Sequence, residues 1–133
     1  GYYFGLRAGF MTGTAYGIAR LITATYVVHP AQFLLDYFLA FAVFGVSGFF
    51  KDKPHGLAIG VTLGAVLRIL VSTTSGVIFF SQFAPPDTRN LFLWSLGINA
   101  PVMLAELAMI LVLILIPPVA KVIEQVRLKV AEN

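Results

Sequence analysis

The sequence predicts an all-α membrane protein, folded as one polytopic bundle of transmembrane helices. Of its 133 residues, 59% are hydrophobic and only 11% are charged, and the mean hydropathy is +0.89, which excludes an ordinary soluble domain. The hydrophobic residues gather into four runs, each long enough for the ~20 residues that cross a bilayer. No basic run interleaved with aromatic residues occurs, so nucleic acid is not expected as a partner.

The four predicted transmembrane helices cover about residues 3–28, 31–50, 57–83 and 91–116. The breaks contain proline or clustered polar residues, at residues 29–30, 51–56, 84–90 and 117–118. Pro30 and Pro117 mark two of these breaks, because proline disfavours helix in the residue before it. Residues 117–133 are expected to form a short amphipathic tail. We therefore expect a single transmembrane domain over residues 1–133, with four crossings.

Positive charge is distributed unevenly between the two ends of the predicted bundle. One end carries Lys51, Lys53, Lys121, Arg127 and Lys129. The loops at the other end carry only Arg89, which Asp87 balances. Because positive residues are enriched on the cytosolic side, the C-terminus is predicted to be cytosolic in a multi-pass protein of the cell membrane. The pattern is already helical near Tyr3, so we expect a fragment. The first crossing would start on the cytosolic side, so the number of preceding helices is expected to be even if the full protein's N-terminus is also cytosolic.

Glycine recurs every fourth residue in the first predicted helix, at Gly5, Gly9, Gly13 and Gly17. Such a row clears one face of a helix, so that another backbone can approach closely. We expect this face to pack inside the bundle rather than to form a dimer seam, because the chain needs such internal contacts.

Asp36 is the most informative polar residue, because it lies in the unbroken apolar stretch 31–50. A charged side chain at mid-bilayer costs roughly 2.5 to 3.5 kcal/mol in insertion measurements, so it must be paired, hydrated or engaged with a ligand. Counting helical turns places Ser72 and Asn99 at a similar depth, in the outer half. A carboxylate, an amide, hydroxyl groups and nearby aromatic rings suit a small cationic heteroaromatic ligand.

The same residues also have structural interpretations that do not involve a ligand. Asp36 and Arg68 could form a buried ion pair that holds two helices together. Trp94 and Tyr26 could belong to an interfacial aromatic belt. Asn99 could serve as a hydrogen-bonding residue between helices.

Glu106 lies deeper in the fourth predicted helix, and Arg7 or Arg20 is its expected partner. The sequence shows no metal-ligand spacing, nucleophile motif or phosphate-binding loop. We therefore expect neither an enzyme nor a protein that holds a metal or cofactor.

Four motifs, GLRAGFMTGTAYGIA, QFLLDY, SGVIFFSQF and WSLGIN, begin at residues 5, 32, 75 and 94. Together they resemble the thiamine-specific substrate-binding (S) components of energy-coupling factor (ECF) transporters, from Gly5 to about Ile116. The resemblance implies a six-helix fold of which this chain would be helices three to six, and thiamine capture from outside a bacterial plasma membrane. The partners that it implies are a transmembrane coupling subunit and ATPase subunits.

The resemblance also implies a set of thiamine-binding residues. Carried over position by position, they are Asp36, Tyr37, Asn99, Trp94, Gly76, Phe80, Ser72, Tyr26, Arg68 and Tyr16. Several depart from the family pattern: Asp36 stands in place of Glu, Ser72 of His and Phe80 of a stacking Trp, and, less drastically, Trp94 in place of Tyr and Arg68 in place of Lys. An S component for another vitamin or a thiamine precursor is therefore an alternative. Further alternatives are a structural membrane subunit and an ion- or proton-coupled transporter with Asp36, Arg68 and Glu106 as a relay.

Overall fold

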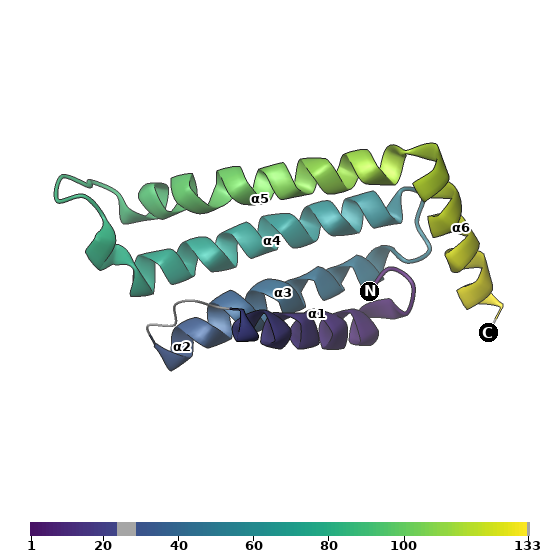
Figure 1. Ribbon diagram of the computed structural model, residues 1–133, viewed down its shortest axis with the longest axis horizontal. Helices are drawn as coiled ribbons and strands as arrows, with labels where there is room; N and C mark the ends of the chain where they lie inside the picture. Colours follow the sequence, from purple (N-terminus) through teal and green to yellow (C-terminus); the bar gives the residue numbers. More distant parts are fainter. Residues whose placement is uncertain (24–28, 133) are drawn as a thin grey trace.

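The computed structural model is an elongated helical bundle, described over residues 1–23 and 29–132 (Figure 1). In chain order the elements are α1 (Gly5–Ile22), α2 (Pro30–Phe33), η1 (Leu34–Leu39), α3 (Ala40–Ala42), η2 (Val43–Phe50), α4 (Gly56–Phe79), η3 (Ser81–Phe83), α5 (Leu91–Leu115) and α6 (Pro117–Ala131). The segments α2, η1, α3 and η2 follow one another without a break and are called here the composite helix. The described residues contain no strand, which confirms the predicted all-α class.

Three helices are long and apolar enough to cross a membrane: Pro30–Phe50, Gly56–Phe79 and Leu91–Leu115. They overlap three of the predicted crossings and confirm a polytopic helical membrane protein, although the third was predicted to reach residue 83 and α4 ends at Phe79. Helix α1 has 18 residues and carries Arg7 and Arg20. It is not among the three, so a fourth crossing stays a prediction. The end of that predicted crossing, residues 24–28, lies outside the described residues.

Helix α6 begins at Pro117 and turns away across the end of the bundle (Figure 1). It forms part of the predicted amphipathic tail. The hydroxyl of Tyr3 lies 3.4 Å from the Ile123 carbonyl oxygen and donates a long hydrogen bond to it. This contact brings the tail beside the start of the described chain.

The composite helix departs from α-helical geometry where Asp36 and Tyr37 stand. Residues Leu34–Leu39 form a π-helical turn, which the Ala40 amide closes by donating to the Leu35 carbonyl. Such a turn changes the direction in which the neighbouring side chains point, and it is frequent at functional sites. The composite helix, Pro30–Phe50, lies over the predicted stretch 31–50, but the sequence pattern did not reveal this turn.

Helix α1 packs against the composite helix (Figure 1), and three of its four glycines, Gly9, Gly13 and Gly17, face that helix, whereas a Cβ at Gly5 would meet nothing within 4 Å. A Cβ added at Gly13 would meet the carbonyl oxygen of Phe41, and one added at Gly17 would meet that of Tyr37. The two backbones are therefore in direct contact. This contact sets the position of α1 relative to Asp36 and Tyr37.

Replacing Gly17 with alanine is expected to destabilise the bundle by about 1 to 3 kcal/mol, the usual cost of overpacking. The reason is that the new Cβ meets the Tyr37 carbonyl, a backbone group that cannot rotate away. The matched control is Gly97→Ala, because a Cβ there meets nothing within 4 Å. Thermal unfolding in detergent, followed by circular dichroism, checks both variants. Equal melting temperatures for Gly17→Ala and wild type would contradict this packing.

Candidate functional site

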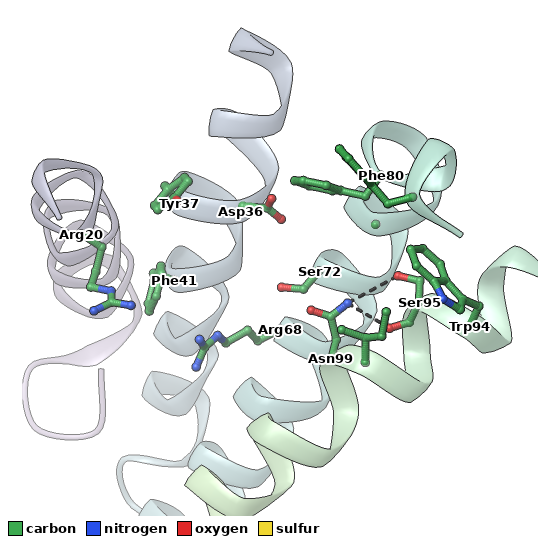
Figure 2. A pocket seen from close by; sticks show the side chains of 13 residues that line it. Arg20, Asp36, Tyr37, Phe41, Arg68, Ser72, Phe80, Trp94, Ser95 and Asn99 are labelled. Atoms are coloured by element: carbon green, nitrogen blue, oxygen red, sulfur yellow. Dashed lines mark hydrogen bonds between the residues drawn. The ribbon is translucent and has the colours of Figure 1, made fainter. Parts of the chain in front are cut away.

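A cavity of about 460 Å³ opens between the composite helix, α4, α5 and the end of α1 (Figure 2). Its volume is within the range of roughly 300 to 1,000 Å³ that is usual for small-molecule sites. It is lined by Arg20, Asp36, Tyr37, Phe41, Arg68, Ser72, Gly76, Phe80, Phe83, Trp94, Ser95, Ile98 and Asn99. We call it the ligand cavity.

Eight of the ten predicted site residues line the ligand cavity: Asp36, Tyr37, Arg68, Ser72, Gly76, Phe80, Trp94 and Asn99. Tyr26 lies outside the described residues. Tyr16 lines a second cavity instead, because its ring is packed edge-on against Phe41, with 5.1 Å between the ring centroids. The structure thus brings most of the predicted residues together, while their contact with a ligand stays a prediction.

Five lining residues were not among the predicted site residues: Arg20, Phe41, Phe83, Ser95 and Ile98. The sequence did contain an indication for Arg20, because an arginine inside an apolar helix needs a partner or a polar cavity, as Asp36 does. No signal was present for Phe41 and Ile98. Apolar residues cover all faces of a membrane helix, so their spacing does not tell which face lines a cavity.

Asp36 is half-buried and forms no ion pair with any described residue. The side chains of Gln32 and Ser75 lie close enough to interact with its carboxyl group, and the Ser75 hydroxyl is buried without a well-formed hydrogen bond. Figure 2 shows the Asp36 carboxyl group on the side of Phe80, away from Arg68. The structural alternative of an ion pair between Asp36 and Arg68 is therefore not observed.

Arg68 is paired with Glu106 of α5, with Nη1 donating to Oε2 at 2.7 Å. The expectation that Glu106 would find Arg7 or Arg20 is thus wrong. The physical reason is the arrangement of the helices: α4 and α5 lie side by side, whereas α1 lies beyond the composite helix (Figure 1). The Arg68 guanidinium also lies 4.8 Å from the centroid of the Phe41 ring, which is a cation–π contact.

A hydrogen-bonded cluster joins α4 and α5 at another wall of the ligand cavity. Ser95 Oγ donates to the Thr73 carbonyl at 2.9 Å, and Asn99 Nδ2 donates to the Ser95 carbonyl at 2.9 Å. The protein thus holds the amide nitrogen of Asn99, and the amide oxygen is left as an acceptor beside the cavity (Figure 2). Gly76 permits this cluster, because a Cβ there would collide with Ser95 Oγ.

Aromatic rings form much of the remaining wall. Phe80 and Phe83 have centroids 6.2 Å apart, Trp94 stands on the facing turn of α5, and Tyr37 stacks on Phe33 at 6.3 Å. A flat cation in this cavity can contact ring faces and a carboxylate at the same time.

The chain is similar to known thiamine transporters over most of its length. The family model described as "Thiamine transporter protein (Thia_YuaJ)" matches residues 1–125. The chain is 34% identical over 113 residues to the thiamine transporter ThiT of Bacillus subtilis, covering 74% of this chain and 58% of the relative. It is 30% identical over 105 residues to ThiT of Lacticaseibacillus paracasei, covering 69% and 52% respectively.

The chain spans little more than half the length of these curated relatives. The family match nevertheless includes the composite helix, α4 and α5, which together supply all the lining of the ligand cavity except Arg20, Phe80 and Phe83. The match also includes these three residues. On this evidence, the chain belongs to the thiamine transporter protein family.

Proposed function

We propose that the chain binds thiamine in the ligand cavity, as the substrate-capture component of a vitamin uptake system. The observation that carries this proposal is Asp36, a half-buried carboxylate in a membrane-spanning helix with no ionic partner among the described residues. Ionisable residues at such depth usually mark the path of a substrate or ion. Thiamine supplies the missing charge, because its thiazolium ring is permanently cationic.

The other walls of the cavity suit the rest of the molecule. Phe80 and Trp94 offer ring faces for stacking, and the free amide oxygen of Asn99 accepts a hydrogen bond from an exocyclic amino group. Ser72 supplies a hydroxyl group. The ligand named for both relatives is thiamine, so it is favoured over another vitamin.

In this proposal, this chain captures the ligand and partner subunits supply the energy for uptake. We propose that a transmembrane coupling subunit and ATPase subunits supply the energy, as the resemblance to S components implies, and that this chain performs no covalent chemistry. A charge relay is less well supported, because Asp36 makes no ion pair with Arg68 or Glu106, which are paired with each other.

Thiamine is expected to quench the fluorescence of Trp94, because this ring lines the cavity. The signal is measured as the difference between wild type and Trp94→Phe during a titration. Phe80→Ala should weaken binding by roughly 0.5 to 1.5 kcal/mol, the value of one aromatic contact, whereas Phe80→Trp should preserve or strengthen it. Unchanged affinity in both Phe80 variants would remove Phe80 from the site, and a lack of any thiamine signal would contradict the proposed function.

For the topology, we propose a cytosolic loop around Lys53, a cytosolic C-terminus, and a cavity mouth that faces outward near Pro86. The reason is the excess of positive charge on the side of Lys53 and Lys121. The measurement is labelling of single cysteines, introduced at positions 53 and 86 in a variant of the full-length protein without other cysteines. Position 86 is expected to react in intact cells. If only the cysteine at position 53 reacted in intact cells, the proposed orientation in the membrane would be reversed.

A further inference from the structure

Two buried polar side chains lie behind the Asp36 carboxyl group, outside the lining of the ligand cavity. Ser75 of α4 is 0% exposed and Gln32 of α2 is 2% exposed. Both side chains are close enough to hydrogen-bond with that carboxyl group. Asp36 lines the ligand cavity, whereas neither Ser75 nor Gln32 does. A ligand in the cavity therefore meets the carboxyl group, and the two residues act on that group from behind it.

The Ser75 hydroxyl is not used by its own helix. Thr62 and Thr74, also on α4, each donate to the carbonyl oxygen four residues earlier, at 2.8 Å. The Ser75 Oγ atom, in contrast, is buried and makes no well-formed hydrogen bond. A buried hydroxyl without a partner costs free energy, and a hydroxyl can rotate to suit an acceptor. The Asp36 carboxyl group is the acceptor beside it.

Gln32 approaches the same carboxyl group from the composite helix. It stands four residues before Asp36, a spacing that brings side chains together on one side of a helix. Asp36 belongs to the π-helical turn Leu34–Leu39, which packs against α4. An amide N–H and a hydroxyl can both donate to a carboxylate, and such charge-assisted bonds are stronger than bonds between neutral groups. The turn thus places the carboxyl group between donors from two different elements.

From this geometry we propose that Ser75 and Gln32 are positioning residues, which fix the orientation of the Asp36 carboxylate toward the ligand cavity. The inference rests on the proposed function, because the carboxylate is taken to face the cationic ring of the ligand. A carboxylate that is already held in place loses less side-chain freedom when the ligand binds, so more of the interaction free energy appears as affinity. The two residues thus act on the ligand only through Asp36.

The experiment is a double-mutant cycle, measured by calorimetric titration of the purified full-length protein with thiamine. Ser75→Ala is expected to weaken binding by about three- to tenfold, the effect of one hydrogen bond. In the Asp36→Asn background the same substitution should change the affinity by less than about twofold, because the carboxylate that Ser75 orients is absent. Gln32→Met, which keeps the length of the side chain and removes its donors, should follow the same pattern.

A control variant and a neutral ligand separate positioning from packing. The matched control is Thr74→Val, which removes a hydroxyl from the exposed neighbouring position and should leave the affinity unchanged. The neutral ligand is an analogue of thiamine in which a thiophene ring replaces the thiazolium ring. It should lose little affinity in Ser75→Ala, because its binding does not depend on the charge of Asp36. A packing defect would weaken the binding of both ligands equally.

The outcomes separate this inference from the proposed function. Thiamine affinity that is unchanged in both Ser75→Ala and Gln32→Met would overturn the inference and leave the proposed function intact. Equal losses in the wild-type and Asp36→Asn backgrounds, or for the charged and neutral ligands, would show a structural role and also overturn it. So would a loss in Thr74→Val as large as that in Ser75→Ala. If Ser75→Ala does not give the wild-type circular dichroism spectrum, Gln32→Met decides by the same comparisons. If wild type binds no thiamine, the proposed function fails, and the inference with it.

Discussion

Asp36→Asn is expected to weaken thiamine binding by about 1.5 to 3 kcal/mol, the value of a hydrogen bond to a charged group. This corresponds to a loss of roughly 10- to 150-fold in affinity. The carboxylate offsets the positive charge of the ligand in a partly desolvated cavity, and asparagine keeps the volume but not the charge. Titration calorimetry of the full-length protein in detergent measures the change.

The same variant should fold normally, and this separates a ligand site from a structural role. Asp36 forms no ion pair with the described residues, so its replacement leaves no described cation unpaired. The melting temperature of the ligand-free protein should therefore change little. The matched control is Asp87→Asn, which removes the same group from an exposed loop position and should leave the affinity unchanged. Thiamine affinity that is equal in Asp36→Asn and wild type would refute Asp36 as the counter-charge.

Glu106→Gln is expected to destabilise the bundle, by about 3 kcal/mol. Removing one partner of a buried pair costs roughly 3 to 5 kcal/mol, and the lower end applies because the Glu106 side chain is 44% exposed while that of Arg68 is 19% exposed. The variant leaves the Arg68 guanidinium with Phe41 as its remaining described partner. Unfolding in a detergent or denaturant series measures the loss.

A second substitution tests whether the loss comes from the stranded charge. Arg68→Gln in the Glu106→Gln background should recover much of the stability, because two neutral amides can hydrogen-bond to each other. A matched control is Glu124→Gln on α6, which removes the partner of Arg127 from an exposed pair at 3.5 Å and should cost less than about 1 kcal/mol. If Glu106→Gln were no more destabilising than this control, the pair between Arg68 and Glu106 would not contribute to the stability of the bundle.

The charged residues show where sequence reasoning succeeded and where it stopped. Asp36 could be singled out because a carboxylate in an apolar run requires an explanation, whatever the packing. The sequence could not decide whether Arg68 or a ligand balances this carboxylate, because Arg68 was expected at a similar depth in the bundle. The structure shows that Arg68 pairs with Glu106 instead, across the contact between α4 and α5. Such a pairing depends on the rotation of each helix about its own axis.

The site shows the same division. Asp36, Ser72 and Asn99 could be placed at one depth by counting turns, because the rise along a helix is constant. Arg20 was not predicted to line the ligand cavity, and Tyr16, a predicted site residue, lines the second cavity. Their positions follow from how closely the glycine face of α1 approaches the composite helix, which sends one side chain to the boundary of the ligand cavity and the other to the second cavity.

By itself, the sequence determined the helical class, the approximate positions of the three apolar spans and the buried carboxylate that most requires an explanation. The physical reason is that the bilayer acts on each segment separately, through its length, its hydrophobicity and the cost of buried charge. Only the tertiary structure decided the π-helical turn at Asp36, the partner of Arg68 and the approach of Arg20 to the cavity. These depend on the register and rotation of neighbouring helices, which are set by side-chain packing and not by the hydrophobicity of any one segment.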